Sequence, residues 1–133
     1  MVRFFIVLAL AGALVGMAIL EQHFIQGAYG RLERDTEALI ASVMADEDKE
    51  AFIATEANIA LVNHMYDYWL VYEKRLSMLA RHFDLAQVSD ALIYAKNFIV
   101  FDNKEEAMAG LLRLRYLIKT HSFNVGTSIQ NVI

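Results

Sequence analysis

Cysteine and proline are both absent from this 133-residue chain, which also has only six glycines. Without cysteine there is no disulfide framework, no thiolate-ligated metal site and no thiol nucleophile. A chain of this length carries about six or seven prolines at ordinary usage. Because proline costs about 3 kcal/mol inside a helix and is accepted in loops and edge strands, its absence indicates long helices joined by few loops.

Charge is sparse as well. Charged residues make up 21% of the chain, hydrophobic residues make up 57%, and the net charge is −4. A disordered chain is poor in apolar residues and rich in charge, so this composition indicates a folded protein. The 12 lysines and arginines form no basic block, and we therefore expect no binding to nucleic acid. The length is that of one domain.

The longest apolar run covers residues 4–20, between Arg3 and Glu21, and contains no polar side chain. A membrane-spanning helix needs roughly 17–25 such residues. We therefore expect residues 1–20 to be an uncleaved membrane anchor and residues 21–133 to form an extracytoplasmic helical bundle. The alternative is a cleaved signal peptide ending at Ala18 or Ala28, although the apolar region of signal peptides is usually only about 7–15 residues long.

The orientation and self-association of this segment follow from a few residues. Arg3 and the terminal amine favour a cytoplasmic N-terminus, although Arg31 and Arg34 on the other flank weaken the bias. We predict a single-pass cell-membrane protein whose C-terminal domain lies outside the cytoplasm. Gly12 and Gly16 form a G-x-x-x-G pattern, which lets two spanning helices approach closely and makes a homodimer possible. The alternative is that apolar helices are simply rich in glycine.

Apolar residues recur at spacings of three and four along the rest of the chain, and no segment shows sustained period-two alternation. One helix is predicted from about residue 4 to residue 44, and polar turns at 45–48 and 102–103 delimit the helices that follow. Short turns between amphipathic helices give antiparallel neighbours. The predicted fold is all-α: an N-terminal transmembrane helix continuing into an up-down antiparallel bundle of about four helices. The predicted core positions are Ile25, Ala28, Leu32, Thr36, Leu39 and Val43; Phe52, Thr55, Ile59, Val62, Tyr66, Trp69, Leu76, Ala80 and Phe83; Leu85, Val88, Leu92, Ala95 and Ile99; and Ala107, Leu111, Leu114, Ile118, His121, Val125, Ile129 and Val132.

The second predicted helix is longer than the space available to it. A continuous helix over residues 47–82 spans about 54 Å, whereas residues 21–45 reach only about 37 Å from the membrane. We therefore expect either a kink near Asn63 and His64 or a tilted bundle.

The same arithmetic places three aromatic side chains of this helix, Tyr66, Trp69 and Tyr72, roughly at the level of the lipid headgroups. Tyrosine and tryptophan favour that level because one end of the ring is apolar and the other is wet. These three residues are therefore the candidate interaction surface. The alternative is that they simply fill the core of the bundle.

Three polar residues are candidates for burial. Glu73 falls where the second stripe calls for an apolar side chain, His82 lies at the junction before the third helix, and His121 lies on the fourth stripe. A structural ion pair, hydrogen bond or cap accounts for each of them better than catalysis does.

Known patterns of reactive and metal-binding residues are missing from the sequence. Four-helix bundles that hold two metals use Glu-x-x-His on two helices, and this chain has no such pair. Phosphate-binding glycine loops, dinucleotide fingerprints and the nucleophile-elbow pattern are also missing. We therefore expect neither a metal nor a cofactor, and we expect the protein not to be an enzyme.

Several stretches of the sequence resemble the domain of unknown function 4363 family over nearly the whole chain. They are residues 48–51, the spacing between Trp69 and the following histidine, residues 82–99, residues 102–121 and the ending at 131–133. The apolar N-terminal span is also similar to that of the family. The chain departs from the family at Leu76, where a second tryptophan is expected, and after His82, where only Asp84 remains of an acid-rich patch.

The resemblance implies a small, membrane-anchored, extracytoplasmic helical protein of the kind found mostly in spore-forming Gram-positive bacteria. It implies a location and a fold but no activity. Together with the missing motifs, it favours a structural or protein-interaction module that binds another protein at the membrane. The alternative is a ligand-sensing or binding module that uses the bundle core around Trp69, Glu73 and His121.

Overall fold

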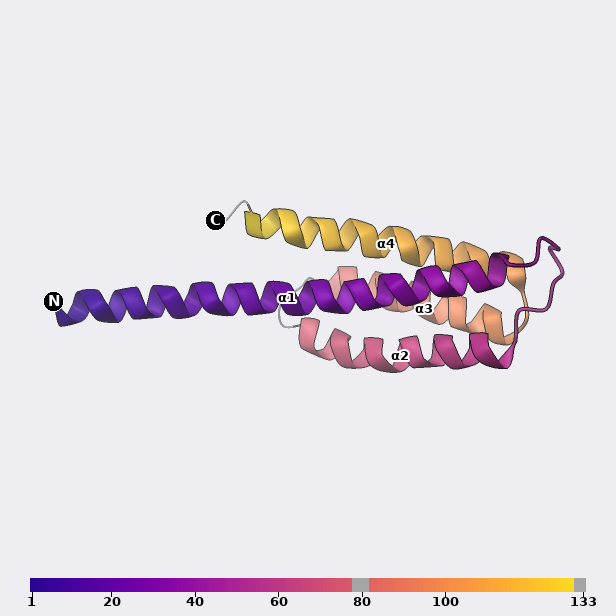
Figure 1. Ribbon diagram of the computed structural model, residues 1–133, viewed down its shortest axis with the longest axis horizontal. Coiled ribbons are helices and arrows are strands. Elements are labelled where there is room, and N and C mark those ends of the chain that lie inside the picture. The colour runs from indigo at the N-terminus through magenta and orange to yellow at the C-terminus, as the bar shows by residue number, and fades with distance from the viewer. Residues whose placement is uncertain (78–81, 131–133) are drawn as a thin grey trace.

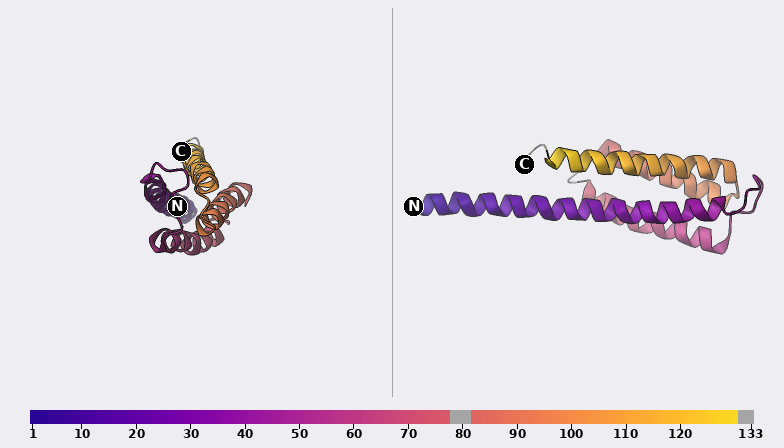
Figure 2. Two further views of the ribbon diagram at one scale, coloured as in Figure 1. Left: turned by 90° about the vertical axis from the view of Figure 1, so that its right-hand side faces the viewer. Right: turned by 45° about the horizontal axis from the view of Figure 1, so that its top comes forward.

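The computed structural model describes the backbone of residues 1–77 and 82–130 and the side chains of residues 1–77 and 83–122. Its helices are α1 (Val2–Met44), α2 (Glu56–Leu76), α3 (His82–Val100) and α4 (Lys104–Gln130). The second and fourth helices pack against the C-terminal half of α1, and α3 packs against α2 and α4 (Figure 1). Viewed end-on, each helix lies beside its neighbours in sequence, and α4 closes the bundle against α1 (Figure 2). The predicted all-α bundle is confirmed.

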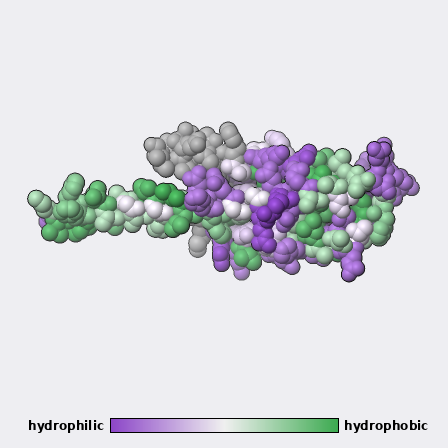
Figure 3. Space-filling model, in the orientation of Figure 1, coloured by the Kyte–Doolittle hydropathy of each residue, from purple (hydrophilic) through white to green (hydrophobic). Residues whose placement is uncertain are grey.

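The first helix has two halves in different surroundings. Its most apolar 18-residue window has a mean hydropathy of 2.4, and none of that window is buried. The first buried side chain is that of Ile25. The exposed half projects from the bundle and is largely green in Figure 3. We call residues 1–20 the apolar arm. The protein therefore has one N-terminal helix that is long and apolar enough to be a membrane anchor or a signal sequence.

The core stripes predicted for the first, third and fourth helices are confirmed. Every position of the first predicted stripe (25–43) and of the third (85–99) is buried, and so is every position of the fourth up to His121. The first helix also buries Tyr29 and Ile40. Its one buried hydroxyl on this stripe is satisfied, because Thr36 Oγ1 donates to the Leu32 carbonyl at 2.6 Å. Predicted positions outside the described residues or side chains are Ala80, Val125, Ile129 and Val132.

The second helix begins later than the sequence predicts, at Glu56 rather than near residue 47. Thr55 is its N-cap, with extended backbone (φ −69°, ψ 153°) and a side chain that accepts a hydrogen bond from the Asn58 N–H. Residues 45–55 instead form a connection with two local turns, in which Asp46 and Asp48 each accept from the backbone N–H two residues on. The expected helix start at residue 47 is therefore wrong, and Asp46 and Asp48 are turn residues.

This later start removes the length problem. The 21 residues of α2 span about 31 Å, against about 36 Å for residues 21–44 of α1. The helix runs without interruption past Asn63 and His64, so the predicted kink there is wrong.

The buried face of α2 also differs in register from the prediction. Its buried residues are Asn58, Val62, Met65, Tyr68, Trp69 and Leu76, with Tyr72 partly buried against the core. Tyr72 therefore occupies the stripe where the sequence suggested Glu73, which is only half-buried. The predicted core residues Phe52 and Phe83 are 67% and 71% exposed.

The turn between α3 and α4 closes tightly on a non-glycine residue. Asp102 has φ 57°, and the N–H groups of Asp102 and Asn103 donate to the carbonyls of Ile99 and Phe98. This is a Schellman ending, in which a left-handed residue redirects the chain and satisfies the last carbonyls. Asn103 then caps α4 by accepting from the Glu106 N–H at 3.1 Å. The third helix begins at His82, so Asp84 lies within its first turn.

The third and fourth helices approach each other very closely at Gly110. A Cβ placed on Gly110 would lie 3.1 Å from the Ala95 backbone nitrogen and 2.8 Å from a ring carbon of Tyr94. The residues buried at this contact are small: they are Ala91, Ala95 and Gly110. This glycine is therefore required by packing rather than by backbone conformation.

Candidate functional site

Trp69 belongs to the core and not to the surface. Its side chain is 0% exposed, its indole Nε1–H donates to Ser89 Oγ at 2.9 Å, and its ring lies 5.7 Å from that of Tyr29. A buried indole normally needs such a partner for its N–H. The interpretation of Trp69 as part of an interaction surface is therefore wrong, and the alternative of core packing is correct for it.

Tyr72 is part of a cluster of aromatic and basic side chains between α1 and α2. Arg31 Nη1 donates to the Tyr72 hydroxyl at 3.3 Å, and Arg31 Nη2 lies 3.1 Å from His64 Nε2. The guanidinium carbon of Arg31 sits 4.1 Å from the centre of the Tyr68 ring, and the rings of Tyr68 and Tyr72 meet edge to face. Two side chains and one aromatic face therefore fix the position of Arg31.

Tyr68 contributes a second hydrogen bond to this seam. Its hydroxyl donates to Asp35 Oδ2 at 2.7 Å. Burial, followed by the hydrogen bond to Asp35 and the charge of that carboxylate, raises the pKa of Tyr68 above its ordinary value. Tyr68 therefore stays a neutral donor over the physiological range, and the cluster is a structural joint between two helices.

Tyr66 lies apart from this cluster, on the side of α2 that faces α3. Its ring is half-buried, and the Lys96 ammonium nitrogen lies over this ring, 4.3 Å from the ring centre. The three predicted surface residues Tyr66, Trp69 and Tyr72 are therefore not brought together on one face.

The depth of these aromatics follows from their contacts with α1. Tyr72 lies beside Arg31, which is about 16 Å along the helix axis beyond Leu20, the end of the apolar run. The headgroup region adds only about 5–7 Å to each side of the hydrocarbon core. The predicted headgroup position of these side chains is therefore not supported, because α2 starts nine residues later than expected.

His121 is the one strongly buried titratable residue found on a predicted stripe. It is 7% exposed, its Nδ1 lies 3.8 Å from Asp84 Oδ2, and neither ring nitrogen has a hydrogen-bond partner within the described part of the chain. Burial and the nearby charge of Asp84 also raise the pKa of Tyr29 to about 12. The side chain of His82, the third candidate, lies outside the described residues.

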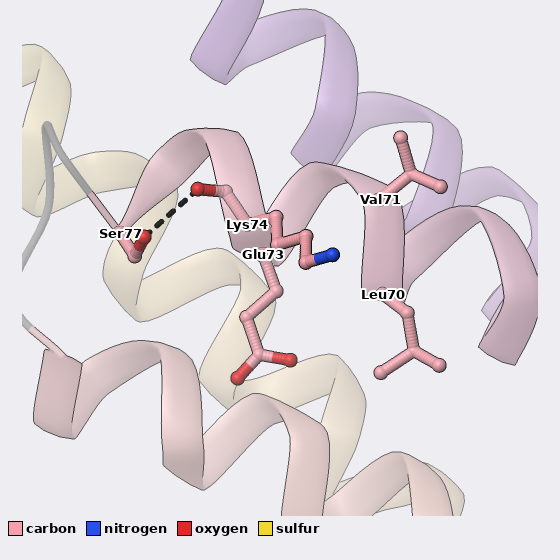
Figure 4. A pocket seen from close by; sticks show the side chains of 5 residues that line it. All are labelled: Leu70, Val71, Glu73, Lys74 and Ser77. Carbon is pink, nitrogen blue, oxygen red and sulfur yellow. Dashed lines mark hydrogen bonds between the residues drawn. The ribbon is translucent and has the colours of Figure 1, made fainter.

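Glu73 lines an open depression on the outer face of α2. The other lining residues are Leu70, Val71, Lys74 and Ser77, so four of the five side chains come from α2 and the fifth from its C-cap. Figure 4 shows them spreading outward from the helix instead of converging on a common point. An open depression whose side chains do not converge does not enclose a ligand.

Gly12 and Gly16 lie on the apolar arm. A Cβ added at either position would meet nothing within 4 Å. Their face is therefore open, and the dimerisation predicted for it stays a prediction.

The bundle end opposite the apolar arm contains a constellation that sequence spacing did not indicate. We call this end the distal tip and define it as residues 44–56 and 100–106. Here the connection between α1 and α2 lies against the turn between α3 and α4 (Figure 1). The Asp102 carboxylate accepts hydrogen bonds from the backbone N–H groups of Ile53 (2.7 Å) and Ala54 (3.2 Å).

A lysine completes this closure of the distal tip. Lys104 Nζ donates to the backbone carbonyls of Asp46 and Asp48, the latter at 2.8 Å. The two connecting segments are thus joined by hydrogen bonds between side chains of one and backbone groups of the other, and each bond links residues more than forty positions apart in sequence. The spacing of residues within each connecting segment gave no signal of that pairing.

Within the part of the chain that the structure describes, no three histidine, aspartate or glutamate side chains gather as a metal would require. No protein-family model, curated protein or solved structure matches the chain. The resemblance to the domain of unknown function 4363 family therefore stays a prediction.

Proposed function

We propose that this protein is a membrane-anchored, extracytoplasmic helical bundle that works by binding another protein and carries out no catalysis. The observation that carries this proposal is the filling of the core around Trp69. Its indole is fully enclosed, contacts Tyr29 and bonds Ser89, so the place where a ligand would enter the bundle is occupied by the protein's own side chains. The binding capacity that is left lies on the outer surface.

The apolar arm supports the anchor. No core residue precedes Ile25, so the bundle gains no core packing from residues 1–20 and their apolar surface needs another environment. A lipid bilayer supplies that environment for a helix of this length. Cleavage after Ala28 would remove Ile25 and Ala28 from the core, whereas cleavage after Ala18 would leave every buried residue in place.

The anchor is tested by extracting native membranes with alkaline carbonate and measuring the mass of the intact chain. We expect the protein in the membrane pellet with residues 1–20 still attached. A soluble chain that begins at residue 19 would contradict the anchor and identify a signal peptide. Protease protection of spheroplasts tests the proposed orientation, in which the bundle is digested from outside.

The interaction function is tested by chemical crosslinking in the native membrane, followed by purification and quantitative mass spectrometry. We expect one partner protein in a fixed ratio to the chain. Recovery of the chain alone, or of copies crosslinked only through the face of Gly12 and Gly16, would contradict binding to a different protein and favour a homodimer.

One observation favours a second candidate, a ligand-sensing bundle. His121 is buried with both ring nitrogens lacking a partner among the described residues, and it faces Asp84 at 3.8 Å. A His121→Gln variant with unchanged partner binding and unchanged thermal stability would remove this candidate.

A further inference from the structure

We infer that the distal tip is the docking surface of this protein and that its partner presents a basic protein surface around an apolar centre. This inference rests on the proposed interaction function and specifies where and with what chemistry it operates. It is carried by the charge, the exposed apolar side chains and the fixed backbone of one end of the bundle.

The first observation is the distribution of charge. The distal tip holds eight carboxylates and two lysines, a net charge of −6, whereas the whole chain has a net charge of −4. The net negative charge is therefore concentrated at one pole. Figure 3 shows hydrophilic residues in purple at the end away from the arm. A cluster of this sign attracts a basic partner and repels a second copy of itself.

The second observation is the exposure of large apolar side chains at the same pole. Phe101 is 76% exposed, Phe52 is 67%, Met44 is 59% and Val100 is 46% exposed. Burying such side chains against a partner removes apolar surface from water and stabilises a complex. Apolar residues rimmed by charged ones are typical of protein interaction sites, whereas a pure cation site would have no need of them.

The third observation is that the backbone carrying these side chains is held in place. Phe52 directly precedes Ile53, and Phe101 directly precedes Asp102, and these two following residues are joined by the 2.7 Å hydrogen bond from the Ile53 N–H to Asp102 Oδ1. Both phenylalanines therefore flank one fixed junction. Ordering costs are lower for a surface that is already rigid, which favours binding without rearrangement.

Three other occupants fit less well. The lipid surface is excluded by position, since the distal tip lies at the opposite end of α1 from the apolar arm (Figure 1). A second distal tip carries the same charge. A divalent cation would leave Phe52 and Phe101 without a role.

The test uses the full-length chain in its native membrane, with a photoreactive benzoylphenylalanine in place of Phe52, Phe101 or, as the matched control, Tyr116. Tyr116 is 67% exposed but lies on the side of α4. We expect adducts with one protein from positions 52 and 101 and at least tenfold less from position 116. The crosslinked peptide of the partner should carry an excess of lysine and arginine.

Charge is tested separately by the double variant Glu105→Lys and Glu106→Lys, with Glu33→Lys on α1 as the control away from the distal tip. We expect the double variant, and a wash in 1 M salt, to lower the adduct yield at position 101 at least tenfold, because both remove the electrostatic attraction. Trp69 fluorescence reports whether each variant is still folded.

Each other outcome overturns the inference. Equal adducts at positions 101 and 116, insensitivity to charge reversal, an acidic partner peptide, or adducts with a second copy of the chain all contradict it. A stoichiometric partner that crosslinks only through other faces leaves the proposed function standing but contradicts the distal tip as the docking surface. The loss of every partner in both experiments removes the proposed function itself.

Discussion

Two seams of this bundle are held together in different ways. The α3–α4 seam brings backbones together through small residues, with Gly110 against Ala95. The α1–α2 seam is spaced by large side chains that bond through their polar ends, such as Tyr68 to Asp35 and Arg31 to Tyr72. The comparison teaches that the same bundle contains a contact intolerant of one added carbon and another that depends on individual hydroxyl groups.

The largest effect is expected at the close contact. Gly110→Val places carbon atoms against the Ala95 backbone, which cannot move as a flexible side chain can, so we expect a loss of about 3 kcal/mol in the free energy of unfolding. Urea unfolding of the full-length protein in detergent, followed by the fluorescence of its single tryptophan, measures this loss. Gly30→Val is the matched control, because a Cβ there meets nothing within 4 Å. Equal effects of the two variants would contradict the difference between the seams.

Alkaline pH should weaken the α1–α2 seam next. The pKa of Tyr29 is raised to about 12 from an ordinary value of 10, so the folded state favours the neutral phenol. The resulting stabilisation is complete below pH 10 and is lost as the pH rises through 12. We expect the melting temperature, followed by far-ultraviolet circular dichroism, to fall steeply between these values.

Two variants assign this pH response. Tyr29→Phe should make the fall between pH 10 and pH 12 shallower, with the remainder coming from Tyr68, whose pKa is also raised, whereas Tyr116→Phe, at an exposed site, should leave it unchanged. An identical fall in Tyr29→Phe and the unaltered protein would show that other groups cause it.

A smaller effect is expected from removing one hydroxyl. Tyr68→Phe deletes the 2.7 Å hydrogen bond to Asp35, and we expect a loss of about 1–2 kcal/mol because the acceptor is charged but only partly buried. The urea midpoint of the full-length protein measures the change. Tyr116→Phe, which loses an exposed hydroxyl, should change stability by less than about 0.5 kcal/mol.

The smallest effect is expected to have the opposite sign. Gly30→Ala on the exposed side of α1 replaces a flexible residue without any contact, so we expect a gain of about 0.5–1 kcal/mol. The same urea experiment measures it. A destabilised Gly30→Ala variant would show that this part of α1 is in contact with something the bundle alone does not provide.

The sequence predicted the core best where the stripe spacing is regular, even where a stripe includes Thr36 or His121. The stripes of α1, α3 and α4 follow regular spacing, so the buried positions could be identified from periodicity alone. The stripe of α2 was misread because it begins with the polar residue Asn58. That residue is buried at 4% exposure, since it accepts from Ser42 and donates to the Ile53 carbonyl.

The candidate site was harder to predict than the core for a physical reason. An exposed aromatic and a buried one look alike in sequence. The sequence therefore allows Trp69 both on the surface and in the core, and it predicts a core position for Phe52, which the structure exposes. The closure of the distal tip depends on bonds from Asp102 and Lys104 to residues about fifty positions away. Local spacing contains no signal of such bonds, because the fold alone brings the partners together.

The unbroken course of α1 makes this helix a lever arm. Membrane-spanning helices tilt by about 20° from the bilayer normal on average, and we apply this tilt to the proposed anchor. The part of α1 beyond Leu20 is about 36 Å long, so such a tilt swings the far end sideways by about 12 Å. Rotation of the tilted rod about the bilayer normal would carry its far end around a circle about 25 Å across, so the proposed anchor would let the distal tip reach neighbouring molecules without bending of α1.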